Sequence, residues 1–283
     1  MTWLPDPLDV SGYFFWLLLI SAGVFALERL RPWRRQQRVL RPGLGQDVFW
    51  LLFNGHFTGV SVAYGATAAL RWASPALEWA ESLRILSAAP LWAQGLLAFV
   101  GKDLVEWCGH NLLHRVPWLW ELHKLHHSIV ELDWIGNFRF HWGEIVVYRA
   151  LTYFPLAVLG VDPRVLLVLA AVGTLIGHLN HSNVDLTWGP LRYVFNSPRM
   201  HVWHHDVAWP ADRPHGVNFG IALSLWDWLF GTAYWPSREE APTQQPAKLG
   251  FVGMERYPRS TIDRLLFPLS LLWARRAPEN ETP

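Results

Sequence analysis

The sequence predicts an all-α integral membrane protein with about four transmembrane helices and a helical cap on one side of the bilayer. Composition favours a membrane protein, because 51% of the residues are hydrophobic and only 17% are charged, against roughly 25% charged residues in soluble domains. The chain also has 19 tryptophans, a residue type enriched where membrane helices meet water. All histidines except His56 lie between residues 110 and 215, most at helical spacings, which predicts further helices beyond the bilayer.

Four apolar runs are candidates for the membrane helices, since a helix needs about 20 apolar residues to cross a bilayer. They are Gly12 to Leu27, Val48 to Leu70, Pro90 to Val105, and Ile145 to Ile176. The last run is interrupted by Gly160–Pro163, and each half is shorter than a full span. We therefore expect the fourth run to form a helical hairpin that enters the bilayer and returns.

The loop charges predict the orientation. The loop between the first two runs is rich in arginine, and the positive-inside rule places such a loop in the cytoplasm. The N-terminus is then expected outside. The third run and the hairpin both end on the cytoplasmic side, so all histidine clusters are expected at that surface. Residues 1–94 thus form an N-terminal transmembrane region with an Arg-rich cytoplasmic loop.

Residues 236–283 are predicted to form a separate C-terminal region. A polar loop with prolines is followed by an apolar segment from Thr261 to Trp273 and a polar tail. The segment is too short to cross a bilayer, so we expect a helix that lies in the membrane interface.

Charge and cysteine content exclude several classes of function. The net charge is +1, and no basic run interleaved with aromatic residues is present, so no nucleic-acid partner is expected. Cys108 is the sole cysteine. An intrachain disulfide and a thiolate-rich zinc or iron–sulfur site are therefore excluded.

The histidines form clusters that predict a metal site. Neutral imidazole is the commonest metal ligand in proteins, and positions i, i+3 and i+4 of a helix lie close together on one face. In each H-x-x-H-H motif the i, i+4 pair shares a face, and the adjacent histidine is placed to reach a second ion. The candidates exceed what one ion binds, so two ions are expected. The candidate ligands are His110, His114, His123, His126, His127, His178, His181, His201, His204 and His205.

Other polar residues have open roles. Asp103 and Glu106 share the face of His110 and are placed to accept hydrogen bonds from imidazole N–H groups; the alternative is a solvated helix end. His141 is either a ligand or a hydrogen-bond partner of a carboxylate such as Glu144, and the role of His215 stays open. His56 is expected to be buried and hydrogen-bonded. A ligand set of many imidazoles suits iron, zinc or copper and disfavours magnesium and calcium.

The motifs resemble the fatty acid hydroxylase / sterol desaturase superfamily of integral-membrane di-metal oxygenases. The resemblance covers residues 95–235, which are therefore expected to form the catalytic domain. The matching motifs are HNLLH (110–114), HKLHH (123–127), RFHWGE (139–144), HSN (181–183), HVWHH (201–205) and NFGIALSLWDWLFGT (218–232).

The resemblance implies two iron ions, with zinc as a possible substitute, that use O₂ and external electrons to hydroxylate or desaturate a lipid. The family's ligand positions fall on the histidines above, with His178 the weakest match. Asn218 and Asp227 match positions that support the site. No HPGG haem motif or G-x-G-x-x-G fingerprint is present, so we expect a separate cytoplasmic donor, ferredoxin- or cytochrome b5-like, with its reductase.

The substrate is left open among fatty acyl chains, sterols, carotenoids and ether lipids. Two other classes of function compete. A di-zinc membrane hydrolase acting on a lipid would use metal-bound water, with Glu106 or Asp206 as the general base. A membrane protein that only stores or senses metal would need a readily exchanging site.

Overall fold

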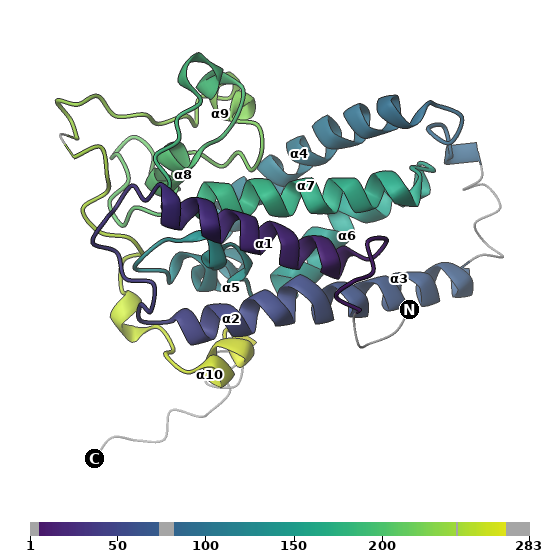
Figure 1. Cartoon of the computed structure of the whole chain (residues 1–283), viewed down its shortest axis with the longest axis horizontal. Coiled ribbons are helices and arrows are strands. Elements are labelled where there is room, and N and C mark those ends of the chain that lie inside the picture. The colour runs from purple at the N-terminus through teal and green to yellow at the C-terminus, as the bar shows by residue number, and fades with distance from the viewer. Residues whose placement is uncertain (1–5, 74–81, 242, 270–283) are drawn as a thin grey trace.

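The computed structural model describes residues 6–73, 82–241 and 243–269, and within them every regular element is a helix (Figure 1). The all-α prediction is confirmed. The elements are α1 (Tyr13–Leu30), α2 (Leu44–Leu52), η1 (Phe53–Phe57), α3 (Thr58–Ala73), α4 (Leu91–Arg115), α5 (Pro117–His127), η4 (Trp134–Phe138), α6 (Trp142–Val158), α7 (Pro163–His181), η5 (Gly189–Tyr193), α8 (Pro198–His204), α9 (Leu225–Leu229), η6 (Met254–Arg256) and α10 (Thr261–Leu266).

The long helices run along one axis of the molecule. Figure 1 shows α1, α7 and the continuous α2–η1–α3 rod extending in the same direction, and α1 packs against α7. The shorter helices α8 and α9 and the loops around them gather at one end of this bundle. We call residues 116–141, 182–241 and 243–257 the cap, because they cover that end.

Among the residues that the structure describes, two helices, α1 and α7, are long and apolar enough to cross a membrane. Together they support a membrane protein. Helix length and apolar composition thus identify fewer membrane crossings than the four that the sequence predicts. The third apolar run lies in α4, whose later turns carry the buried charges Lys102, Asp103 and Glu106. The second run is broken into α2, a π-helical turn and α3. The number and direction of the crossings stay predictions.

The predicted break in the fourth run is the turn between α6 and α7. Gly160 has a φ of +80°, a left-handed conformation that a glycine adopts without steric cost. Asp162 then caps α7, since its side chain accepts a hydrogen bond from the backbone N–H of Arg164 at 2.8 Å. Pro163 occupies the first helical position, where its missing N–H costs nothing.

The arginine-rich loop does more than indicate orientation. Arg41 is buried and pairs with Asp133 and with Asp47, the latter at 2.7 Å between Nη2 and Oδ2. Arg139 reaches the other oxygen of Asp47 at 2.5 Å. These paired charges join the loop and α2 to the two ends of the segment that contains η4, which fixes the chain between α5 and α6.

The predicted interfacial helix begins where expected, at Thr261. Ser260 caps it by accepting a hydrogen bond from the backbone N–H of Asp263 at 3.1 Å. The helix ends at Leu266, before the expected end at Trp273. The last residues of the predicted segment and the polar tail lie outside the described residues.

Candidate metal centre

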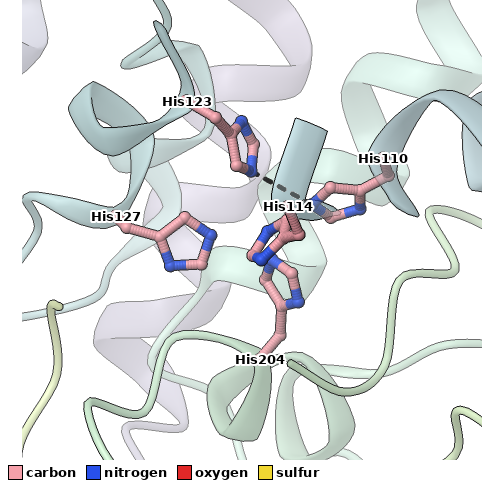
Figure 2. A group of neighbouring side chains, drawn as sticks. All are labelled: His110, His114, His123, His127 and His204. Carbon is pink, nitrogen blue, oxygen red and sulfur yellow. Dashed lines mark hydrogen bonds between the residues drawn. The ribbon is translucent and has the colours of Figure 1, made fainter. Parts of the chain in front are cut away.

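Nine histidines converge in two adjacent groups at the junction of the bundle and the cap. In each group the candidate ligand atoms all lie within 4.8 Å of one another. Figure 2 shows the first group, with its rings turned toward a common centre. The five-histidine group contains His110, His114, His123, His127 and His204, and the four-histidine group contains His126, His181, His201 and His205.

The helical spacing explains how two short helices serve both groups. On α5, His123 and His127 are four residues apart and join the five-histidine group, whereas His126 points to the other group. At α8 the arrangement is reversed. His201 and His205, the residue after the helix, join the four-histidine group, whereas His204 joins the five-histidine group. One helical turn therefore presents ligands to two centres, as the sequence spacing predicts. The two groups therefore share α5 and the end of α8, and each of these segments contributes ligands to both groups.

The distances between ring nitrogens fit bound metal ions. Nε2 of His181 lies 3.2 Å from Nε2 of both His126 and His201. In the other group, Nε2 of His110 lies 3.2 Å from Nε2 of His123. Nitrogens bound tetrahedrally at about 2.0–2.1 Å from zinc would lie roughly 3.3–3.4 Å apart. A metal ion between the rings would satisfy several lone pairs at once.

Several ring nitrogens have no hydrogen-bond partner among the described residues. Both nitrogens of His114 and of His127 are buried and unpartnered, as is Nε2 of His204. Buried polar atoms without partners are rare because each one costs free energy. Each neutral ring has one nitrogen with a free lone pair, so this concentration of unpartnered ring nitrogens is consistent with a site that binds cations.

Hydrogen bonds from Nδ1 fix the orientation of four of the grouped rings, so that Nε2 of each ring stays available for a metal ion. Nδ1–H of His110 donates to the carbonyl of Phe219, and that of His204 to the carbonyl of Val217, each at 2.8 Å. In the same way, His181 donates to the carbonyl of Gly177 at 2.8 Å. Because a carbonyl only accepts, Nδ1 carries the proton in each ring. Nε2 is left as the free lone pair, the arrangement usual for metal-binding histidines.

Glu144 orients a fourth ring. Its Oε1 accepts a hydrogen bond from Nδ1 of His123 at 2.8 Å, and both side chains are buried. A carboxylate in this position raises the basicity of the imidazole and fixes its tautomer. Sequence reasoning considered Glu144 only as a partner of His141. The 21 residues that separate it from His123 form no local pattern that would reveal the pair.

Burial keeps the imidazoles of His127 and His204 neutral. Desolvation, followed by repulsion from His205, holds the pKa of His127 well below its usual range. Desolvation and the neighbouring His110 do the same to the pKa of His204. A histidine must be neutral to bind a metal, so His127 and His204 are in the ligand form at physiological pH.

Asp227 and Asn218 support the site through the backbone between α8 and α9. The carboxylate of Asp227 accepts hydrogen bonds from the N–H groups of Phe219 and Gly220, each at 2.8 Å. The Asn218 amide donates to the carbonyl of Met200 at 2.8 Å. Neither side chain is bonded to a histidine. Both hold the segment whose Val217 and Phe219 carbonyls orient His204 and His110.

Asp103 and Glu106 also lack a hydrogen bond to any histidine, although the sequence places them on the face of His110. Asp103 accepts hydrogen bonds from the N–H groups of Ala222 and Leu223 at 2.8 and 3.1 Å, so it anchors the same segment. Glu106 pairs with Lys102 at 2.5 Å between Oε1 and Nζ. Both carboxylates are buried, so they do not form a solvated helix end. Asp103 supports the site indirectly through this segment, whereas Glu106 pairs with Lys102.

The remaining histidines lie outside both groups. His178 was a predicted ligand, but its Nε2 lies 3.0 Å from the Ser21 hydroxyl and its Nδ1 lies 3.3 Å from the amide of Asn137. His141 caps α6 and contacts the carbonyl of Leu265 at 3.1 Å. His56 is buried with its ring against Phe14, as expected, and His215 is exposed.

Comparison with known proteins identifies the family. The family model for fatty acid hydroxylase matches residues 95–232. An ornithine lipid hydroxylase, OlsE, from Rhizobium tropici is 32% identical over 230 residues, which are 80% of this chain and 68% of that protein. The chain belongs to the fatty acid hydroxylase family. The match confirms the predicted resemblance and the predicted class of oxidoreductase.

Other relatives are more distant. An alkylglycerol monooxygenase from Xenopus tropicalis is 25% identical over 251 residues, 84% of this chain, and the chain spans only 49% of its length. A very-long-chain aldehyde decarbonylase from Oryza sativa subsp. indica is 27% identical over 143 residues, 50% of this chain and 52% of that protein. No solved structure matches the chain significantly.

Proposed function

We propose that this protein is a membrane-bound hydroxylase that inserts one oxygen atom of O₂ into a C–H bond of a membrane lipid. The observation that carries the proposal is the pair of adjacent all-histidine groups in a chain of the fatty acid hydroxylase family. The named activities of the two relatives, an ornithine lipid hydroxylase and an alkylglycerol monooxygenase, favour hydroxylation over desaturation.

The nine grouped histidines are the proposed ligands, five for one ion and four for the other. His178 is left out of this set because both of its ring nitrogens contact Ser21 and Asn137. We propose iron as the working metal, since O₂ chemistry needs a redox-active ion and imidazole suits iron. A bound iron pair would supply the reduction of O₂ that makes C–H oxidation possible.

The reaction needs partners that the chain does not supply. One oxygen atom enters the C–H bond and the other leaves as water, which consumes two electrons and two protons. We propose that a separate ferredoxin- or cytochrome b5-like protein with its reductase delivers the electrons. The role of the chain's own residues is to orient the ligands. Glu144 and the carbonyls of Val217, Phe219 and Gly177 fix four rings, so little reorganisation remains when metal binds.

The membrane topology is part of the proposal. We propose that α4 and the α6–α7 hairpin lie in the bilayer with α1 and α2–α3, with the N-terminus outside and the histidines at the cytoplasmic surface. The apolar character of α1 and α7 and the arginine-rich loop after α1 support this arrangement.

A hydrolase is less well supported. Glu106, one candidate for its general base, is buried and paired with Lys102.

The hydroxylase and the hydrolase can be distinguished experimentally, because only the hydroxylase needs O₂. Cells that express the wild type or His126→Ala are grown under ¹⁸O₂, and their lipids are analysed by mass spectrometry. We expect a lipid with one ¹⁸O atom in the wild type and none in the variant.

His178→Asn is the matched control, because it changes a buried histidine outside both groups. It is expected to keep the labelled product and the bound metal. A new lipid product that forms equally well without O₂ would overturn the hydroxylase.

A further inference from the structure

A second feature lies beside the five-histidine group on the cap side. A pocket of about 400 Å³ opens there, within the range of small-molecule sites. We call it the cap pocket. It is formed by the end of α4, the start of α5 and two loops of the cap. Six of its lining residues carry the argument: His114, Arg115, Trp120, Asp206, Trp209 and Phe251.

The inner end of the cap pocket reaches the proposed metal site. His114 lines the pocket and also belongs to the five-histidine group. Trp120 and Trp209 flank it, with ring centroids 4.9 and 5.5 Å from that of His114. A molecule that fills the pocket therefore lies against a proposed ligand.

Two opposite charges lie along the same pocket. Arg115 is exposed at the end of α4, and Asp206 is partly exposed after α8. Among the described residues neither forms an ion pair, and the one hydrogen bond to the Asp206 carboxylate comes from the backbone N–H of Ala208 at 3.1 Å. By contrast, the buried carboxylates of Asp103, Glu144 and Asp227 accept hydrogen bonds that hold the site or its supporting segment in place. Arg115 and Asp206 are therefore available for a ligand.

The chemistry of the lining predicts what binds. A guanidinium recognises a carboxylate through paired, charge-assisted hydrogen bonds. A carboxylate attracts an ammonium group, and the faces of Trp120 and Trp209 would add cation–π attraction. A ligand with both an anionic and a cationic group would satisfy Arg115 and Asp206 together.

We propose that the cap pocket binds a zwitterionic amino-acid head group, with its carboxylate at Arg115 and its ammonium at Asp206. This inference rests on the proposed function and names the substrate class and the end of the molecule that is oxidised. The head group lies beside His114, so one oxygen atom of O₂ enters a head-group C–H bond. The other oxygen atom leaves as water, with two electrons from the donor protein and two protons.

The test measures binding apart from turnover. Purified, metal-loaded full-length protein is kept in detergent under argon with no electron donor. Labelled ornithine lipid, phosphatidylglycerol with the same acyl chains, and free ornithine are titrated against the wild type, Arg115→Gln and Asp206→Asn. Arg238→Gln is the matched control, since this arginine is exposed on a loop away from the pocket. Metal content and thermal unfolding of each variant show that it is folded.

We expect saturable binding of the ornithine lipid, weakened about tenfold or more in Arg115→Gln and Asp206→Asn and unchanged in Arg238→Gln. Arg115→Lys keeps the charge and should restore part of the affinity. Competition by free ornithine would show that the head group alone is enough. Equal affinity for both lipids, or wild-type affinity in both pocket variants, would overturn the proposal.

Addition of donor and ¹⁸O₂ separates this inference from the proposed function. Label in the head-group fragment supports both. Label in the acyl chains alone overturns the head-group inference and leaves the hydroxylase standing. Intact binding without oxidation of any lipid overturns the hydroxylase and leaves the binding pocket.

Discussion

The two histidine groups share helices α5 and α8 but are held in place differently. In the five-histidine group, three rings donate to oxygens from distant segments, namely Glu144 and the carbonyls of Val217 and Phe219. In the four-histidine group, Nδ1 of His181 donates to a carbonyl, but this carbonyl belongs to Gly177 in its own helix and not to a distant segment. The Nδ1 atoms of His126, His201 and His205 are buried and have no hydrogen-bond partner in the part of the chain that the structure describes.

The two proposed metal sites are therefore unequal. The five-histidine group depends on long-range hydrogen bonds, and it borders the cap pocket through His114. The four-histidine group has fewer hydrogen bonds of this kind, and Phe140 stacks on its His126 with centroids 4.2 Å apart. Substitutions outside the ligands should therefore affect one site at a time.

Single substitutions that remove a ligand from one group or the other should have the largest effect on metal content and activity. His204→Ala and His205→Ala change neighbouring residues of the same region but different groups. We expect each variant to lose one of two metal ions per chain and its lipid product. Elemental analysis of the purified proteins measures this. Retention of both ions in either variant would contradict the division into two groups.

Glu144→Gln should have the next largest effect, and only on the five-histidine group. Removal of the charge that orients His123 is expected to weaken that metal by roughly 10–100-fold. Titration against a chelator measures both affinities. Glu121→Gln is the matched control, since Glu121 pairs with Lys124 on α5 and contacts no grouped histidine. Equal weakening of both metals by Glu144→Gln would count against the comparison.

Asp227→Asn should act on the same group less directly. The new amide cannot accept all the hydrogen bonds that hold Phe219 and Gly220. Loss of a buried charged acceptor costs about 1.5–3 kcal/mol, so the thermal unfolding midpoint should fall. The affinity of the five-histidine group should fall by less than in Glu144→Gln. An unchanged unfolding midpoint would show that Asp227 does not anchor this segment.

Phe140→Leu should give the smallest effect, mainly on the four-histidine group, because its ring lies 4.2 Å from that of His126 and 6.3 Å from that of His123. Loss of the ring stacked on His126 removes about 0.5–1.5 kcal/mol of interaction, which is roughly a two- to tenfold change in affinity. The chelator titration used for Glu144 measures it. A fall in metal affinity confined to the five-histidine group would contradict the expectation that Phe140 mainly supports the four-histidine group.

The sequence predicts the parts of this protein that depend on local spacing. The apolar runs locate the long helices, and the Gly160–Pro163 break locates the turn between α6 and α7. The H-x-x-H-H spacing predicts that His123 and His127 share a face while His126 points elsewhere, because helix geometry alone decides this.

The sequence does not predict contacts that depend on the packing of distant segments. His178 has the same spacing to His181 as the ligands have to one another, yet it faces Ser21 on α1. Glu144 meets His123 only because α6 packs beside α5. Asp103 and Glu106 share a face with His110, but the cap segment and Lys102 take their hydrogen bonds.

The most direct test of the account is the metal content of the wild-type protein, purified in detergent without oxygen from iron-replete cells. The two groups predict about two irons per chain. One ion per chain would contradict two separate sites, and no stoichiometric metal would contradict the metal centre itself.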